Sequence, residues 1–233
     1  MQLNFAAKEV VLKLVYYGPA LSGKTSNLKA LHDRVDASAR GRLMTLATRD
    51  DRTLFFDMLP LAIRGDGMSL RIKVFTVPGQ VVHASTRRFV LQGADGVAFI
   101  ADSQIAETEN NAASFRDLRD NLRELGRAIR DVPLIIQFNK RDMPDIRSEQ
   151  ELRTLAQKGR EPVYAATAVN GAGVLETFFG LLSSTCTKLD EEHQLSQKLG
   201  LTMTKLLETA AWQFGCEQPY QDLVKACLHG AKP

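Results

Sequence analysis

The stretch Gly18-Pro19-Ala20-Leu21-Ser22-Gly23-Lys24-Thr25 decides the fold of this 233-residue chain. It has the spacing G-x-x-x-x-G-K-[ST] of a phosphate-binding loop. A β-branched and aromatic run, residues 10–17, precedes it, and apolar residues at helical spacing (Leu28, Leu31, Val35) follow it. A strand, a turn and a helix in this order place backbone N–H groups and the positive end of the helix dipole around an anion. A chance match to the pattern is the alternative, and the flanking strand and helix argue against it.

The side chains of this loop predict a site for a nucleotide polyphosphate and a metal ion. Lys24 supplies a point charge to the β- and γ-phosphates, and the Thr25 hydroxyl is a hard oxygen ligand for Mg²⁺. The residues expected to bind the phosphates are Gly18, Ala20, Leu21, Ser22, Gly23, Lys24, Thr25 and Ser26.

The rest of the first two-thirds of the chain alternates between strand-like and helix-like patterns. Residues 70–77 alternate apolar and polar side chains, as a half-exposed strand does. Residues 96–101 and 133–138 are almost continuously apolar, which is typical of strands covered on both faces. Between them, residues 115–129 carry an apolar stripe on a charged segment, which predicts an amphipathic helix. This alternation predicts an α/β fold of three layers, with a mostly parallel central sheet flanked by helices.

A second polar motif, Asn139-Lys140-Arg141-Asp142, directly follows the apolar run 133–138. It therefore lies at the carboxyl end of a strand, where open α/β sheets bind ligands. The Asp142 carboxylate can accept hydrogen bonds from two donor groups of guanine, whereas adenine would leave it unpaired. Asn139 can bridge the base and the phosphate loop, and the Lys140 stem can lie along the ring. A polar helix-capping turn is the alternative, and an ATP-using P-loop kinase is disfavoured, so we predict GTP and GDP as the ligands.

A weaker signal lies downstream, where residues 165–169 read Ala-Ala-Thr-Ala-Val. The Ala168 N–H could meet the guanine O6, with Thr167 supporting the loop. Any turn of small residues between a strand and a helix has the same pattern.

Three motifs, residues 18–25, 76–80 and 139–142, occur in the order seen in Ras-like small GTPases. The segment 46–57, Leu-Ala-Thr-Arg-Asp-Asp-Arg-Thr-Leu-Phe-Phe-Asp, is more particular. Together with Thr-Val-Pro-Gly-Gln at 76–80 and the strand-like run that leads into Asp-Ser-Gln at 102–104, it resembles the bacterial MglA small GTPases, regulators of cell polarity and gliding motility. The likeness covers about residues 5–186 and implies a slow molecular switch that hydrolyses GTP with Mg²⁺.

Further roles follow from the resemblance, residue by residue. Arg52 matches an internal arginine finger and Gln80 matches the glutamine that positions the attacking water, so both are the expected catalytic residues. Thr53 matches the threonine that senses Mg²⁺ and the γ-phosphate, and with Thr25 it is an expected metal ligand. The Gly79 N–H is expected to bind the γ-phosphate. Without the resemblance, Arg52 could equally well be one partner of a solvent-exposed ion pair.

Two positions depart from the usual Ras pattern. Thr76 stands where Ras-like proteins place the aspartate that orients Mg²⁺ through water, a substitution shared by the MglA group. Because a neutral hydroxyl holds metal-bound water more weakly than a carboxylate, we expect a modest Mg²⁺ affinity. Ala20 stands where glycine is common, and its methyl is expected to slow hydrolysis. The alternative function is therefore an interaction scaffold that stays bound to GTP.

Partners are implied by the same resemblance. A dimeric roadblock-fold activator of the MglB type would reset the switch segments, and effectors would bind in a switch-dependent way. Phe55, Phe56 and Met58 lie beside the first switch, as core strand residues or as part of an effector face.

The change of pattern at about residue 187 predicts two parts, a small GTPase domain at residues 1–187 and a C-terminal helical extension at residues 188–233. Apolar side chains at helical spacing predict a helix over about 195–210, followed after Gly215 and Pro219 by a short helix from Tyr220. The extension either packs on its own domain or docks on a partner or a membrane.

Composition excludes several other classes. A net charge of +3 is too near balance for a nucleic-acid binder, and three widely spaced cysteines predict neither a disulfide framework nor a zinc site. No apolar run reaches the length of a membrane span, and neither a secretory signal nor a lipid-anchor motif is visible. We therefore expect a cytoplasmic protein.

Overall fold

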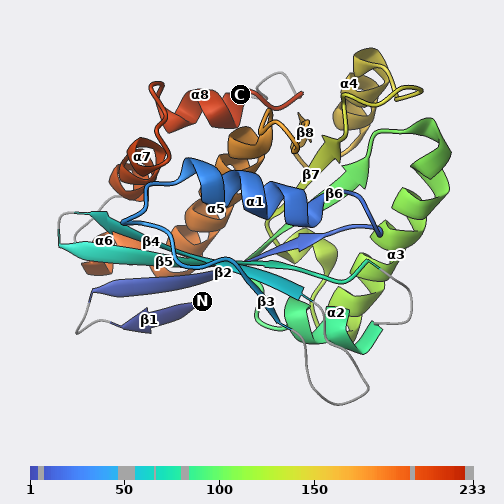
Figure 1. Ribbon diagram of the computed structural model, residues 1–233. Coiled ribbons are helices and arrows are strands. Elements are labelled where there is room, and N and C mark those ends of the chain that lie inside the picture. Colours follow the sequence, from blue (N-terminus) through green and yellow to red (C-terminus); the bar gives the residue numbers. More distant parts are fainter. Residues whose placement is uncertain (5–7, 47–55, 66, 80–83, 200–202, 229–233) are drawn as a thin grey trace.

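The computed structural model describes residues 1–4, 8–46, 56–65, 67–79, 84–199 and 203–228. They form an α/β fold in which helices cover both faces of one mixed sheet (Figure 1). The strand order is β3-β4-β5-β2-β6-β7-β8, and β1 pairs with β2 beside this path. Strands β5, β2, β6, β7 and β8 run parallel to one another, whereas the β3–β4, β4–β5 and β1–β2 pairs are antiparallel. The predicted fold class is confirmed.

The elements have the following bounds. The strands are β1 (Gln2–Asn4), β2 (Glu9–Tyr17), β3 (Met44–Leu46), β4 (Phe56–Gly65), β5 (Met68–Thr76), β6 (Gly96–Asp102), β7 (Leu134–Asn139) and β8 (Val163–Ala165). The helices are α1 (Lys24–Arg34), α2 (Ala84–Leu91), α3 (Thr108–Glu124), α4 (Glu149–Lys158), α5 (Val174–His193), α6 (Leu195–Leu199), α7 (Met203–Gln213) and α8 (Tyr220–Lys225). The described residues also include the short 3₁₀ turns Ile105–Glu107 and Ile129–Asp131.

The four predicted strands of the first two-thirds are confirmed as β2, β5, β6 and β7. The predicted helix 115–129 is α3, which begins earlier, at Thr108, and ends at Glu124; its last expected residue, Ile129, belongs to the 3₁₀ turn. Phe56 and Met58 are half-buried residues of β4, and the Phe56 ring packs on Phe75 with centroids 5.9 Å apart. Phe55 lies outside the described residues.

Each face of the sheet has its own hydrophobic core, because successive strand residues point to opposite faces. In β2, Leu14 and Tyr16 belong to the core under α1 and α5, whereas Val15 and Tyr17 belong to the core under α2 and α3. The sheet is therefore held from both sides, and the loops at its carboxyl edge rest on a closely packed base.

The described part of the C-terminal extension packs on the preceding part of the chain and shares the core under α1 and α5. Phe214, which is 2% exposed, lies against the rings of Phe178 and Phe179 in α5, with centroids 5.1 and 5.7 Å away. Figure 1 shows α7 and α8 beside α5. The backbone joins as well, since the Leu228 N–H donates to the carbonyl of Val163 in the edge strand β8 (2.7 Å).

Two details differ from the expected layout of the extension. The predicted boundary after residue 187 lies inside α5, which continues to His193. The division into two domains stays a prediction. The segment predicted as one helix over 195–210 contains two, α6 and α7. Trp212 does not join the core, because it is 78% exposed.

These contacts predict that the extension stabilises the whole chain. We expect Phe214→Ala to lower the free energy of unfolding by about 3–5 kcal/mol, the usual cost of removing a buried phenylalanine ring. The control is Trp212→Ala, which removes an exposed ring two residues earlier in the chain. This substitution should change the free energy of unfolding by less than about 0.5 kcal/mol. Denaturant unfolding measures both, and an unchanged stability of Phe214→Ala would contradict the packing.

Candidate functional site

The candidate site lies at the carboxyl edge of the parallel strands. Strand β2 leads into the phosphate loop, residues 18–25; β7 leads into the motif 139–142; and β8 leads into residues 166–173, here called the base loop. Because β2, β6, β7 and β8 are parallel neighbours, these segments meet at one edge, as ligand sites of open α/β sheets do. The topology therefore brings together motifs that are more than a hundred residues apart in the sequence.

The backbone of the phosphate loop requires both of its glycines. A Cβ on Gly18 would lie 2.1 Å from the Ile100 carbonyl oxygen, and one on Gly23 would lie 2.0 Å from Asn139 Nδ2. Gly23 also caps α1 with a left-handed backbone, φ 94°. The loop thus lies close to β6 at Gly18 and close to β7 at Gly23. The tip of the loop is exposed to solvent, since Leu21 is 88% exposed.

Lys24 is buried beneath this loop. Its ammonium donates to the carbonyl oxygens of Gly18 (2.9 Å) and Pro19 (2.5 Å), and the residue is 7% exposed. Burial lowers the pKa of Lys24 to about 7; the like charge of Arg87 adds to this, and the Asp57 carboxylate opposes it. Without an anion the charge of Lys24 is only weakly compensated, so the position favours a bound polyanion.

Asn139 joins the phosphate loop to the base loop. Its Nδ2 donates to the Ser22 carbonyl (2.8 Å), and its Oδ1 accepts from the Ala168 N–H (2.9 Å). The residue is 2% exposed, so both bonds are shielded from water. The bond to Ser22 links Asn139 to the phosphate loop, and the predicted bridge from this loop to the base stays a prediction. The predicted donation from Ala168 to guanine O6 stays a prediction, since here the same N–H donates to Asn139.

The neighbours of Asn139 are oriented by their own contacts. Lys140 has a left-handed backbone, φ 63°, and its Nζ lies 2.6 Å from Asp102 Oδ2 at the end of β6. Asp142 is exposed at this edge of the sheet. Thr167 is buried, and its N–H donates to the Ala172 carbonyl, which closes the base loop on itself. The arrangement leaves a carboxylate open to solvent beside two loops that are tied together.

A carboxylate to which the sequence analysis gave no role lies at the phosphate loop. Asp57 of β4 is 9% exposed and accepts from the Thr25 hydroxyl at Oδ2 (2.6 Å) and from the Thr45 hydroxyl at Oδ1 (2.8 Å). Thr76 is also in contact: its hydroxyl donates to Asp57 Oδ2 (3.2 Å) and accepts from the Asp57 N–H (2.9 Å). The oxygen atoms beside Thr25 therefore include a carboxylate, which comes from the strand next to β5.

The segment after β5 reaches the phosphate loop directly. A Cβ on Gly79 would lie 2.4 Å from both the Cα and the N of Ala20, so only glycine fits this approach. A cavity of about 470 Å³ opens beside this contact and reaches Arg87 in α2 and Asp117 in α3. Arg87 Nε donates to Asp117 Oδ2 (2.7 Å), which also accepts from the Tyr17 hydroxyl. These contacts connect the residue before Gly18 to the helix that follows Gly79.

Three predicted residues, Arg52, Thr53 and Gln80, lie outside the described residues, and their roles stay predictions. Sequence reasoning missed the buried polar side chains that support the site. For two of these side chains, Asp57 and Gln137, the sequence contains a local pattern that indicates burial. Asp57 shares its strand face with Leu59 and Leu61 by two-residue spacing, and Gln137 is the one polar residue of the apolar run 133–138.

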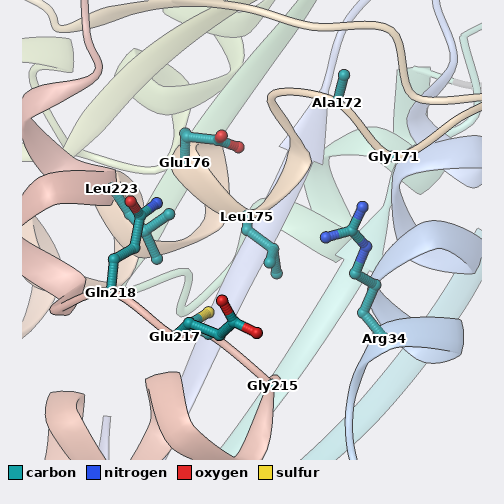
Figure 2. A pocket seen from close by; sticks show the side chains of 10 residues that line it. Arg34, Gly171, Ala172, Leu175, Glu176, Gly215, Glu217, Gln218 and Leu223 are labelled. Atoms are coloured by element: carbon teal, nitrogen blue, oxygen red, sulfur yellow. The ribbon is translucent and has the colours of Figure 1, made fainter.

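The extension forms one wall of a second cavity, of about 440 Å³, whose opposite wall includes the base loop. Figure 2 shows Arg34, the last residue of α1, extending toward Gly171, with Glu217 and Gln218 of the extension on the other side. A Cβ on Gly171 would lie 3.3 Å from Arg34 Nη2, so the guanidinium packs on the base loop. The extension and the base loop are thus close neighbours.

No family model matches the chain. It is 42% identical over 189 residues to the "Mutual gliding-motility protein MglA" of Myxococcus xanthus (strain DK1622), a match that covers 80% of this chain and 96% of the relative. The geometry agrees with this relationship: a phosphate-loop lysine, a motif with Asn139 and Asp142, and a tie between their loops lie at one sheet edge. The chain belongs to the MglA family of small GTPases.

Proposed function

We propose that this protein is a GTP-binding switch that hydrolyses GTP to GDP and phosphate. It would regulate motility, as the name of its relative suggests, and cell polarity, as the family resemblance implies. The observation that carries the proposal is the double hydrogen bond of Asn139, which holds a phosphate loop and a base loop together. The identity to MglA supports it. The relationship gives no support to the scaffold alternative.

At the phosphate end, Lys24 and the first turn of α1 would hold the polyphosphate. Negative phosphates stabilise the ammonium form, so binding raises the pKa of Lys24 above its ligand-free value of about 7. The complex therefore favours the charged form of Lys24. The affinity for the nucleotide is highest below about pH 7, where the free protein already carries this charge, and falls as the pH rises above 7. Gly18, Ala20, Leu21, Ser22, Gly23, Thr25 and Ser26 would complete the cradle.

At the base end, the exposed Asp142 carboxylate would accept from the two donor groups of guanine. Lys140, anchored to Asp102, would lie along the ring, and Thr167 and Ala168 would bound its far edge. Discrimination against adenine arises because an unpaired carboxylate beside a bound base costs free energy.

The residues around Thr25 fit a magnesium ion. Mg²⁺ prefers oxygen ligands and is usually held by one or two protein groups together with phosphates and water. The Thr25 hydroxyl, the Asp57 carboxylate and the Thr76 hydroxyl offer such a set, and the described residues contain no cluster of three or more His, Cys, Asp or Glu side chains that could hold a metal alone. Asp57 would supply the negative charge that Thr76 lacks, which removes the reason for expecting a modest Mg²⁺ affinity. Mg²⁺ would neutralise charge on the phosphates.

The catalytic part of the proposal rests on Arg52 and Gln80, with Thr53 as a metal ligand and Gly79 as the donor to the γ-phosphate. The close approach of Gly79 to Ala20 supports the last role, because it places this backbone at the phosphate loop. Ala20 is the residue at this contact, and we retain the expectation that its methyl slows hydrolysis.

A dimeric roadblock-fold activator of the MglB type and switch-dependent effectors are the proposed partners, and a cytoplasmic location goes with them. Among the described residues, no helix is both long enough and apolar enough to cross a membrane.

The base specificity provides the first test. Native protein should bind GDP at least about a hundredfold more tightly than ADP, and Asp142→Ala should lose most of that preference by weakening GDP alone. The control is Asp131→Ala, which removes an exposed carboxylate between α3 and β7. Calorimetric titration of the three proteins with GDP and ADP measures all six affinities, and a guanine preference that survives Asp142→Ala would refute the assignment of the base site.

The metal site and hydrolysis are tested together. Native protein loaded with GTP should convert it to GDP over hours in Mg²⁺, and Asp57→Asn should need about tenfold more Mg²⁺ for the same single-turnover rate, because a carboxylate is lost beside the ion. Thr45→Val removes a hydrogen bond to Asp57 but keeps the carboxylate, so its Mg²⁺ dependence should stay native. GTP that persists in the native protein would contradict hydrolysis, and an unchanged Mg²⁺ dependence in Asp57→Asn would contradict the metal role.

A further inference from the structure

Strand β7 carries a second polar side chain on the face that carries Asn139. Gln137 lies two residues earlier, and residues two apart in a strand point to the same face. Gln137 is completely buried, with 0% exposure, in a strand otherwise composed of apolar residues up to Asn139. A buried amide of this kind must find partners for all its polar atoms.

Its partners come from the two helices that follow the nucleotide loops. Gln137 exchanges two hydrogen bonds of 2.9 Å with Asn27 of α1 and donates a third, of 2.8 Å, to Thr177 Oγ1 of α5. Asn27 and Thr177 are also 0% exposed. Helix α1 begins at the phosphate loop and α5 begins at the base loop, so Gln137 joins the two helices one layer beneath the Asn139 bridge.

Both ends of this chain of hydrogen bonds return to the loops in the same way. Asn27 Nδ2 donates to the Gly23 carbonyl (3.0 Å), and the Thr177 hydroxyl donates to the Gly173 carbonyl (2.7 Å). Gly23 and Gly173 are the left-handed N-cap residues of α1 and α5, with φ of 94° and 74°. Each polar side chain therefore fixes the residue at which its loop turns into its helix.

The hydrogen bonding of the three side chains is complete and has one consistent orientation. The Thr177 hydroxyl gives its proton to Gly173, so it must accept from Gln137 Nε2, and this places Gln137 Oε1 toward Asn27 Nδ2. Both protons of each amide group are used. A fully satisfied buried network is rigid, and losing one member leaves an unpaired group in an apolar setting.

We propose that Asn27, Gln137 and Thr177 are positioning residues that hold the phosphate loop and the base loop at the spacing of a guanine nucleotide, and thereby set how long the nucleotide stays bound. Because all three are completely buried, none of them would touch the ligand. They act through the N-cap glycines of α1 and α5, while Asn139 fixes the same two loops from above. This inference rests on the proposed guanine-nucleotide binding.

The test compares two threonines of one helix. Thr177→Val removes the hydroxyl that joins Gln137 to Gly173, whereas Thr185→Val removes an equally buried hydroxyl of α5 that donates only within the helix, to the Leu181 carbonyl (2.7 Å). Both variants should lower the melting temperature to a similar extent. Only Thr177→Val should speed the release of a fluorescently labelled GDP, by about tenfold, and Thr177→Ser, which keeps the hydroxyl, should restore the native rate.

Release from Thr177→Val at the rate of Thr185→Val would overturn the proposal, since a merely structural role predicts equal effects. If either valine variant does not fold, the pair Thr177→Ala and Thr185→Ala is compared by the same criterion. Native protein that fails to bind labelled GDP would refute the proposed function itself, which is a different outcome from equal release rates in proteins that bind it.

Discussion

Two hydrogen bonds from one buried side chain, Asn139, fix the geometry on which the site depends. They connect the Ser22 carbonyl to the Ala168 N–H, and through them the turn after β2 is held to the turn after β8. In the proposed complex a nucleotide would touch both turns, so a fixed spacing means that little conformational entropy would be lost when it binds. Such bonds are strong here because the surroundings exclude water, and the same burial makes their loss costly.

The sheet and the C-terminal helices supply the support for that geometry. Parallel β2, β7 and β8 bring the loops to one edge, and α1 and α5 pack against the same face. The extension adds Phe214 to the aromatic contacts of α5 and a backbone hydrogen bond to β8. The extension therefore stabilises β8 and α5, the two elements that flank the base loop. An independent appendage would make no such contacts.

The sequence allowed the class of fold, four strands and the main loop residues to be predicted, because these depend on local patterns: the glycine spacing at 18–25, continuous apolar runs, and Asn139 at a strand end. Strand β3 escaped prediction, and β4 was anticipated only by the option that Phe56 and Met58 are core strand residues. Its length was missed, since it contains Pro60 and depends on antiparallel pairing with β5. Asp57 and Gln137 escaped for a related reason. A lone polar residue in a strand gains meaning only when its partners, far away in the chain, are known. The roles of Arg52, Thr53 and Gln80 stay predictions.

The central claim is that the two loops are tied together before any nucleotide arrives. Amide hydrogen exchange of ligand-free protein, followed at the Ala168 N–H by nuclear magnetic resonance, measures this most directly. The account predicts that this amide exchanges slowly, as a buried donor to Asn139 Oδ1 does, and that Asn139→Ala makes it fast. An Ala168 amide that exchanges in the native protein as quickly as one in an unstructured peptide would contradict the account.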